Sequence, residues 1–440
     1  MKLSRFAIAA ALLLFGAASL NSQTREDIYA RGLGGDLERT AGVYHSYEAV
    51  EGPLTAAPSG YKAFYVSHYG RHGSRRQIGS SGTEAYRYLS EASKAGALTP
   101  LGERLLKDVT AVYECHVGMD GELTIRGGYE HRGIAERMYG RFKEAFRDRD
   151  RTVVHCQASI IPRCLISMAN FTYSLKSKAP ALQFDFITGQ KYIDLLAQDF
   201  YDRDSYRKRQ NEINDSLLKA YVDPSRIMKA FFKDPSVIDN PRRFMRYLFA
   251  LASDCQDLRE ELDGLSLYGY FTEDELIGLG RYFNERTYSS FGNSAEFGDN
   301  VIWAAKPLVE DFISRADAAV AGNDVAADLR FGHDSGLLPL AGLLGLEDLS
   351  SRYHVGEAWQ NGYFIWESIP MGSNLQMIFY RGRGNDVIVK ILYNEKERRI
   401  PALDERIRAA GGRLPEGPFY RWDDLRGYLV SISENKELGK

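Results

Sequence analysis

Residues 61–75 read Tyr-Lys-Ala-Phe-Tyr-Val-Ser-His-Tyr-Gly-Arg-His-Gly-Ser-Arg. The β-branched and aromatic first half of this stretch predicts a buried strand, and its glycines predict a turn directly afterwards. The turn carries Arg71, His72 and Arg75. Because α/β enzymes commonly place their chemistry where a buried strand ends, the stretch predicts an α/β fold with a functional site at this point.

The chain around this stretch alternates between predicted strands and helices, with one long helical block. This pattern indicates an α/β core with a central, mostly parallel sheet flanked by helices, and a helical cap insertion. The predicted divisions are a signal peptide (1–22), the core (23–180 and 319–440) and the cap (181–318). Further strands are expected at 152–157 and 329–333, a hairpin at 375–380 and 386–393, and helices at 81–95, 100–113, 124–142, 166–173 and 337–344.

The first 22 residues have a basic start, an apolar run from Phe6 to about Phe15 and an exit of small residues. This is the pattern of a secretory signal peptide. No later stretch approaches the ~20 apolar residues that cross a bilayer. We therefore expect an exported protein, periplasmic or secreted, without a membrane span after signal cleavage.

Composition excludes some classes of function. The chain has 440 residues and a net charge of −3, whereas a nucleic-acid binder is usually basic, so we expect no nucleic-acid partner. The four cysteines, Cys115, Cys156, Cys164 and Cys255, fit no zinc or redox spacing. The sequence is consistent both with one or two disulfides and with free buried thiols.

The segment Arg71-His72-Gly73-Ser74-Arg75 carries the densest chemical signal. An arginine matches phosphate oxygens bidentately and keeps its charge at any working pH. A neutral imidazole can attack phosphorus and form a covalent intermediate. Two alternatives are a zinc pair of His68 and His72 on one helical face, which the nearby glycines disfavour, and a solvated basic turn without a role.

Two distant segments add candidate residues. His333 and Asp334 follow a predicted strand, and a carboxylic acid could protonate a leaving group there. Arg163 lies where a strand ends and a helix begins, a place where backbone N–H groups also attract anions. Considered alone, a pair such as His333-Asp334 more often just caps the following helix, and an arginine such as Arg163 more often forms a surface salt bridge.

Together these segments resemble the histidine acid phosphatases, branch two of the histidine phosphatases. Arg71-His72-Gly73-Ser74-Arg75 matches the R-H-G-x-R signature, His333-Asp334 matches the late H-D motif, and Arg163 with Ser159 and Ser167 matches the second arginine segment. The nearest subgroup is the multiple inositol polyphosphate phosphatases. Segments similar to that subgroup are His131-Arg132-Gly133-Ile134-Ala135, Ser373-Asn374-Leu375-Gln376 and Val389-Lys390-Ile391-Leu392-Tyr393-Asn394-Glu395.

The sequence departs from the family pattern in two places. Gln77 stands where a proline often closes R-H-G-x-R-x-P, which alters the loop. His333-Asp334-Ser335 replaces the subgroup's usual H-A-E, which moves the expected proton donor and leaves the exact substrate open.

The resemblance implies His72 as nucleophile, with Arg71, Arg75, Arg163 and His333 holding the phosphoryl group. Asp334 would be the general acid and would later activate water. The alternative donors are Glu367 and a residue of the helical insertion. No metal or cofactor is implied. The expected partner is a phosphorylated small molecule, an inositol polyphosphate such as phytate. Alternatives are a broad acid phosphatase or sugar phosphatase, and an inactive phospho-ligand binder.

Basic charge is concentrated in the expected cap. Between residues 201 and 246, eleven Lys and Arg face seven Asp and Glu. If this basic segment lies over the active site, it would bind a substrate with several phosphates faster and orient it better. The alternative is that these residues form a solvated helical face without substrate contact. We treat the remaining histidines without a matching motif as structural: His45, His116, His155 and His354.

Overall fold

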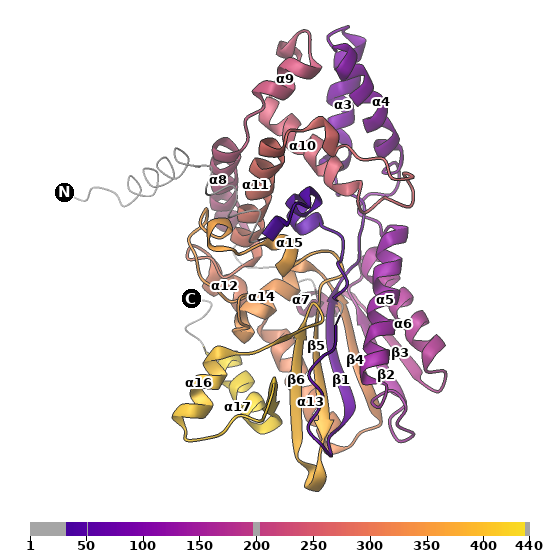
Figure 1. The fold of residues 1–440 in the computed structure, drawn as a ribbon, viewed down its shortest axis with the longest axis vertical. Helices are drawn as coiled ribbons and strands as arrows, with labels where there is room; N and C mark the ends of the chain where they lie inside the picture. The colour runs from indigo at the N-terminus through magenta and orange to yellow at the C-terminus, as the bar shows by residue number, and fades with distance from the viewer. Residues whose placement is uncertain (1–31, 51, 197–202, 436–440) are drawn as a thin grey trace, which may run out of the picture.

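The computed structural model describes residues 32–50, 52–196 and 203–435. The expected signal peptide lies outside the described residues. Within them, no helix combines the length and apolar character that crossing a membrane requires. Figure 1 shows a sheet with helices on both faces and a bundle of helices above one of its edges.

The described strands form one mixed sheet in the order β3-β2-β4-β1-β5-β6-β7, with β8 paired to β6. Strands β3, β2, β4 and β1 run parallel, whereas β5 is antiparallel to β1 and forms the expected hairpin with β6. The α/β fold class is therefore confirmed. The strands are β1 (Lys62–Arg71), β2 (Val153–Ala158), β3 (Gln183–Thr188), β4 (Val325–Gly332), β5 (Asn374–Arg381), β6 (Val387–Tyr393), β7 (Lys396–Arg398) and β8 (Phe419–Arg421).

Two sets of helices cover the sheet. Helices α5 and α6 pack on one face, and α13, α14 and α17 pack on the other (Figure 1). The α-helices are α3 (Ser80–Lys94), α4 (Pro100–Glu114), α5 (Ile125–Phe142), α6 (Pro162–Lys178), α7 (Ile193–Leu196), α8 (Arg203–Tyr221), α9 (Ser225–Phe231), α10 (Pro241–Asp254), α11 (Glu273–Phe291), α12 (Gly298–Trp303), α13 (Lys306–Ala321), α14 (Asp334–Leu344), α15 (Ile365–Ser368), α16 (Pro401–Ala409) and α17 (Trp422–Ser433). The 3-10 helices are η2 (Leu37–Tyr44), η3 (Gln190–Tyr192), η4 (Pro235–Val237), η5 (Tyr268–Tyr270), η6 (Trp359–Asn361) and η7 (Arg383–Asn385).

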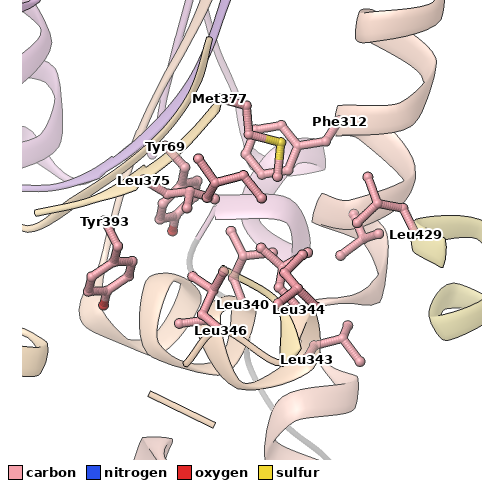
Figure 2. Packing of buried hydrophobic residues seen from close by; sticks show 14 of the residues in the cluster. Tyr69, Phe312, Leu340, Leu343, Leu344, Leu346, Leu375, Met377, Tyr393 and Leu429 are labelled. Carbon is pink, nitrogen blue, oxygen red and sulfur yellow. The ribbon is translucent and has the colours of Figure 1, made fainter. Parts of the chain in front are cut away.

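The central strands β1, β4, β5 and β6 are buried on both faces of the sheet because they are apolar at successive positions. Along β5, Leu375 and Met377 join the cluster beneath α14, whereas Ile378 joins the cluster beneath α5. Figure 2 shows Leu375 and Met377 facing Leu340 of α14 and Phe312 of α13. Each fully buried side chain of this kind stabilises the fold by roughly 1.5–3 kcal/mol.

The helices above the sheet share a separate apolar core. It joins α3 and α4 with α9, α10 and α11, through residues such as Leu89, Val109, Phe231, Phe249 and Phe283. Residues 80–114, which lie within the predicted core segment 23–180, thus share an apolar core with helices of the predicted cap. Conversely, β3 lies in the sheet although it falls within 181–318. The outer limits of the domains themselves stay a prediction.

All four cysteines are free thiols in the structure. Burial raises the pKa of Cys164 and of Cys255 to about 12, so both remain protonated at neutral pH. Of the two possibilities that the sequence left open, free thiols are the one observed.

Candidate active site

The parallel strands β1 and β4 end beside each other. Arg71 of β1 pairs in register with Gly332 of β4, and the backbone N–H of His72 donates to the Gly332 carbonyl at 3.0 Å. His333 directly follows β4, and the centroids of the His72 and His333 rings lie 5.6 Å apart. Because parallel strands place their carboxyl ends at one edge, residues far apart in sequence meet here.

The side chain of His72 is held as a neutral imidazole. Its side chain is buried, and Nδ1 lies 2.9 Å from the Gly73 carbonyl oxygen. A carbonyl only accepts hydrogen bonds, so Nδ1 carries the proton and Nε2 keeps its lone pair. Burial lowers the pKa of His72 well below its usual range, and the charges of Arg163, Arg71 and Arg75 lower it further.

Three arginines surround His72 with unsatisfied donors. Arg71 is fully buried, and its Nη1 donates to the carbonyls of Val43 (2.8 Å) and Ile369 (2.7 Å). The buried Nε atoms of Arg71, Arg75 and Arg163 have no hydrogen-bond partner among the described residues. A buried donor without a partner costs about 1–3 kcal/mol, so these donors indicate a site built for an anion.

Arg163 and His333 are brought to the site by β2 and β4. Strand β2 ends next to β4, and Arg163 lies in the first turn of α6, which begins at Pro162. Ser159, in the connection between them, places its Oγ 3.1 Å from Nε2 of His333. Burial, followed by the charge of Arg163, lowers the pKa of His333 to about 4. Like His72, this imidazole is neutral at neutral pH.

Asp334 begins α14 and faces the arginines. Its Oδ2 lies 3.3 Å from Nη2 of Arg71, and its Oδ1 accepts the backbone N–H of Ser335 at 3.0 Å. Burial by itself would raise the pKa of the Asp334 carboxyl, but Arg71, His333 and Arg75 outweigh burial and hold it below its usual value. The carboxylate is therefore ionised while these arginines have no other anion beside them.

The loop after His72 is packed directly against α5. A Cβ atom at Gly73 would lie 2.5 Å from the carbonyl oxygen of Gly127, so only glycine allows this approach. Ser74 Oγ then lies 2.7 Å from both Glu130 Oε1 and Asp257 Oδ1. A hydroxyl has one proton to donate, so one of the two acids must be protonated and donate a hydrogen bond to Ser74 Oγ. Burial raises the pKa of both acids, in agreement with this count.

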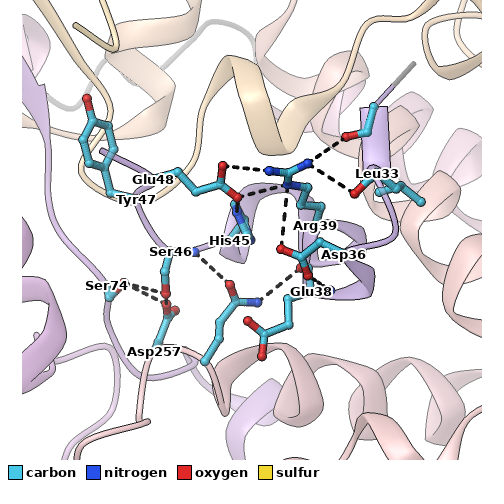
Figure 3. A network of polar contacts seen from close by, with 12 residues as sticks. Leu33, Asp36, Glu38, Arg39, His45, Ser46, Tyr47, Glu48, Ser74 and Asp257 are labelled. Atoms are coloured by element: carbon cyan, nitrogen blue, oxygen red, sulfur yellow. Dashed lines mark hydrogen bonds and ion pairs between the residues drawn. The ribbon is translucent and has the colours of Figure 1, made fainter. Parts of the chain in front are cut away.

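The same acids tie the loop to η2 and the cap. Figure 3 shows Ser46, Ser74 and Asp257 in one network, in which Ser46 Oγ donates to Asp257 at 2.6 Å. The Gln77 amide donates to the carbonyl of Ala250, at 3.1 Å. Gln77, which stands where the family pattern often has a proline, thus contacts α10. The sequence analysis missed these supporting residues, because isolated carboxylates on different helices leave no spacing signal.

Several residues that the sequence analysis considered do not lie at this site. His68 lies within strand β1, packed against Phe171 and Phe331, so the reading that places it on a helical face with His72 is wrong. Glu367 is exposed and pairs with Lys396 at 2.9 Å. The four remaining histidines contact carboxylates: His45 with Glu48, His116 with Asp254, His155 with Asp328, and His354 with Glu296.

All six residues expected at the site converge in the structure: Arg71, His72, Arg75, Arg163, His333 and Asp334. We call this set the phosphoryl cluster. It contains three arginines, one aspartate and two neutral histidines, so its net charge is positive. The N-termini of α6 and α14 also meet here, and their backbone dipoles favour an anion. The arrangement can bind a tetrahedral oxyanion and present a histidine nitrogen to it.

Comparison with known proteins places this geometry in context. The sequence profile of the histidine phosphatase superfamily (branch 2) matches residues 70–394. No curated protein sequence matches the chain significantly.

Solved structures share the fold. A Bifidobacterium longum multiple inositol polyphosphate phosphatase, in complex with inositol hexasulfate, aligns with a TM-score of 0.71 at 19% identity, over 91% of this chain and 99% of that one. The phytase from D. castellii aligns with a TM-score of 0.66 at 17% identity, over 91% and 86%. A Hafnia alvei phytase, in complex with myo-inositol hexakis sulphate, aligns with a TM-score of 0.54 at 13% identity, over 86% and 99%.

Proposed function

The chain belongs to branch 2 of the histidine phosphatase superfamily, and we propose that it hydrolyses phosphate monoesters through a phosphohistidine formed at His72. One observation carries this proposal. His72 is neutral, its Nδ1 proton is directed to the Gly73 carbonyl, and the arginines with unsatisfied donors surround it. Such a nitrogen can form a covalent intermediate that divides hydrolysis into two displacements.

In the first displacement, Nε2 of His72 attacks phosphorus while the bond to the ester oxygen breaks. Arg71, Arg75 and Arg163 neutralise the charge on the phosphoryl oxygens, as cationic groups do in other phosphoryl transfers. His333 adds a hydrogen bond. The Asp334 carboxyl gives its proton to the departing oxygen, and the alcohol leaves.

The second displacement reverses these roles. The Asp334 carboxylate takes a proton from water, the resulting hydroxyl attacks phosphorus, and the bond from phosphorus to His72 breaks. Orthophosphate is released, and His72 regains its lone pair at Nε2. Asp334 ends the cycle protonated, ready for the next ester.

The low pKa of Asp334 before substrate binds does not conflict with its role as an acid. Arg71 and Arg75 are what hold that pKa down. A bound phosphate dianion neutralises these guanidiniums and adds negative charge beside the carboxylate, and a neighbouring negative charge raises a carboxyl pKa. The substrate thereby promotes the protonation of its own acid catalyst, and we expect turnover to be fastest at acidic pH.

We propose an inositol polyphosphate, such as phytate, as the substrate. The segments that resemble the multiple inositol polyphosphate phosphatases support this choice, as does the excess of cationic charge at the site. The structural relatives named as such phosphatases or as phytases agree with it. A broad acid phosphatase is the second candidate, and a product profile from inositol hexakisphosphate separates the two.

The covalent step has a direct test. The protein is mixed with 32P-labelled substrate in the presence of a chelator, quenched with alkali, and separated under alkaline conditions. We expect a labelled protein whose phosphate is stable to alkali and released by acid, as a phosphohistidine is. The absence of label in a protein that turns over substrate would reject the proposed intermediate. Hydrolysis abolished by the chelator would contradict a mechanism that relies on arginines alone.

We also propose that the protein is exported, on the basis of the signal-peptide pattern of residues 1–22. N-terminal sequencing of the protein recovered outside the cytoplasm should begin near Gln23. Recovery in the cytoplasm with the N-terminus intact would contradict export.

A further inference from the structure

Ser74 connects residues 72–75, which we call the His72 loop, to α5 and to the cap. Its backbone N–H donates to Glu130 Oε2 of α5 at 2.7 Å, and its Oγ lies 2.7 Å from Glu130 Oε1. On the other side, the same Oγ lies 2.7 Å from Oδ1 of Asp257, in the segment that follows α10 (Figure 3). Because Ser74 is only two residues from His72, these contacts hold the backbone beside His72 between α5 and the cap.

The oxygens of the two acids differ in their hydrogen bonds. Glu130 accepts from the N–H and Oγ of Ser74 and from the N–H of Tyr47 at 2.9 Å, which fits an ionised carboxylate. Asp257 Oδ1 accepts from Ser46 Oγ at 2.6 Å, but the buried Oδ2 has no hydrogen-bond partner among the described residues. A buried, ionised oxygen without a partner is costly. The proton that Ser74 requires therefore belongs on Asp257, which donates it to Ser74 Oγ.

The charges around Asp257 favour its neutral form. Burial, followed by the charges of Asp254 of α10 and Glu130 of α5, raises the pKa of Asp257 well above its usual range. Arg71 of β1 also interacts electrostatically with Asp257. Burial raises the pKa of Glu130 as well, but its hydrogen bonds and the charge of Arg126 counteract burial. Of the two acids, Glu130 thus has the better support for a negative charge.

We propose that Ser74, Glu130 and Asp257 form a proton-dependent clamp, in which neutral Asp257 is a positioning residue that fixes the His72 loop to the cap for attack on phosphorus. This inference rests on the proposed phosphatase activity. If Asp257 ionises, two carboxylates face one hydroxyl that can donate to only one of them, and the loop loses its contact with the cap. A displacement of about 1 Å at a reacting group can cost about 10²-fold in rate.

Two replacements of Asp257 separate positioning from a purely structural role. The amide of Asp257→Asn is neutral and can still donate to Ser74, so kcat for 4-nitrophenyl phosphate should stay close to the native value. Asp257→Ala removes the contact, and kcat should fall by about 10- to 100-fold. Equal values of kcat in the two variants, or an unchanged kcat in Asp257→Ala, would overturn the proposal.

Glu285 provides the matched control. It is another buried acid of the cap, and its two oxygens accept the backbone N–H groups of Gly356 and Trp359 at 2.8 and 2.7 Å. An amide cannot accept both bonds, so Glu285→Gln should lower Tm but keep kcat. A loss of kcat in Glu285→Gln as large as that in Asp257→Ala would show a general effect of destabilising the cap and would overturn the proposal.

The pH profile is a readout that a purely structural role would not change. 4-Nitrophenyl phosphate has a good leaving group, so its kcat depends little on the acid Asp334. In the native protein, kcat for this ester should fall as pH rises through the raised pKa of Asp257, because the neutral form is lost. Asp257→Asn cannot ionise and should keep its kcat over that range. A fall at the same pH in both proteins, or in neither, would overturn the proposal.

A second variant covers the case in which circular dichroism shows Asp257→Ala to be unfolded. Ser74→Ala removes the hydroxyl that Asp257 binds and keeps the N–H that binds Glu130. Its kcat should also fall by about 10- to 100-fold. An unchanged kcat in Ser74→Ala would overturn the proposal.

Infrared spectroscopy detects the proton without turnover. At neutral pH, the native protein should show the C=O stretch of a protonated carboxyl that shifts on 13C labelling of aspartate and is lost in Asp257→Asn. The absence of this band would overturn the proposal. A native protein that shows the band but hydrolyses no phosphate ester would instead reject the proposed phosphatase activity.

Discussion

The phosphoryl cluster lies at the carboxyl end of β4, a second group of charged residues lies beside the middle of the same strand, and the two groups differ in their balance of charge. The second group, which we call the balanced cluster, consists of His155, Asp311, Arg315, Asp328 and Arg330. Asp311 contacts Arg330 at 2.6 Å, and Asp328 contacts Arg315 at 3.2 Å and His155 at 3.0 Å. Two arginines thus face two aspartates, whereas in the phosphoryl cluster three arginines face one.

The contrast shows in two fully buried arginines. Burial lowers the pKa of Arg71. Burial would also lower the pKa of Arg330, but Asp311 and Asp328 outweigh it and raise that pKa above its usual value. A pocket of about 210 Å³ opens beside the balanced cluster, yet its charges cancel. Unpaired cations, rather than the presence of a pocket, therefore identify the site for a phosphate.

Replacing one histidine in each cluster by alanine should give the largest difference in activity between the two clusters. His72→Ala removes the proposed nucleophile, and kcat should fall by at least about 10⁵-fold, as it does when a catalytic nucleophile is deleted. His155→Ala is the matched control and should keep its activity, because His155 contacts Asp328 and not the phosphoryl cluster. Initial rates with 4-nitrophenyl phosphate measure both. More than trace activity in His72→Ala would disprove the nucleophile assignment.

Arginine replacements should change activity in one cluster and stability in the other. Arg163→Gln should lower kcat/KM by about 10³-fold, because one cation that stabilises the transition state is lost. It should not lower Tm, since it also relieves repulsion with Arg75.

Arg315→Gln is the counterpart in the balanced cluster. It should leave kcat/KM unchanged and lower the stability by less than about 1 kcal/mol, because the pair with Asp328 is partly exposed. Thermal denaturation with steady-state kinetics on the same samples checks both variants. A loss of Tm in Arg163→Gln without a loss of activity would reverse the comparison.

Asp334→Asn should separate substrates by leaving group. An alkyl phosphate needs a proton in the transition state, so its kcat should fall by about 10²- to 10⁴-fold, whereas 4-nitrophenyl phosphate should lose far less. In the native protein, kcat for the alkyl ester should fall as pH rises through the pKa of Asp334 in the complex, and this dependence should vanish in Asp334→Asn. Equal losses on both esters would assign the proton to another group.

Asp328→Asn tests the balanced cluster through pH. Burial would raise the pKa of Asp328, but His155, Arg330 and Tyr65 lower it below its usual value. A depressed folded pKa contributes stability above the unfolded pKa of about 4, and this contribution is lost as pH falls through the folded pKa. Urea denaturation should show the variant to be about 2 kcal/mol less stable at neutral pH, with the gap closing in acid. A gap that does not change with pH would contradict the assignment.

The smallest effect is expected on the outer surface of the cap. Arg207, Lys208 and Arg209 are exposed on α8, and Arg209 lies over the Phe297 ring at 5.2 Å. Replacing all three by Gln should raise KM for inositol hexakisphosphate by about twofold at low salt, through the long-range field alone. Salt titration of KM checks this, and 4-nitrophenyl phosphate is the control. An effect of about tenfold or more would indicate a direct contact between the substrate and α8.

The pattern of residues determined much of the fold. The run of apolar residues before Arg71 predicted β1, and the structure confirms it at Lys62–Arg71. The helices expected at 100–113 and 124–142 are α4 and α5, and the residues that precede them, Thr99 and Thr124, accept hydrogen bonds from the backbone N–H groups of Gly102 and Gly127. Strand and helix signals of this kind are local, because they depend on residues a few positions apart.

The cap illustrates where local signals fail. Residues 80–114 are helical by pattern, but nothing in that pattern states which other helices they pack against. The structure shows that α3 and α4 share their core with α10 and α11. Packing partners depend on contacts between distant segments, so the apolar core that α3 and α4 share with α10 and α11 emerged only from the tertiary structure.

The sequence by itself determined the α/β class, the motifs around His72, Arg163 and His333, and the family that these motifs resemble. The tertiary structure alone decided which charges remain uncompensated. Arg71 and Arg330 are the same residue type on neighbouring strands, and the positions of Asp311, Asp328 and Asp334 set their different charge balance. The physical reason is that a charge's environment is set by burial and by partners brought together through folding, which residue spacing does not encode.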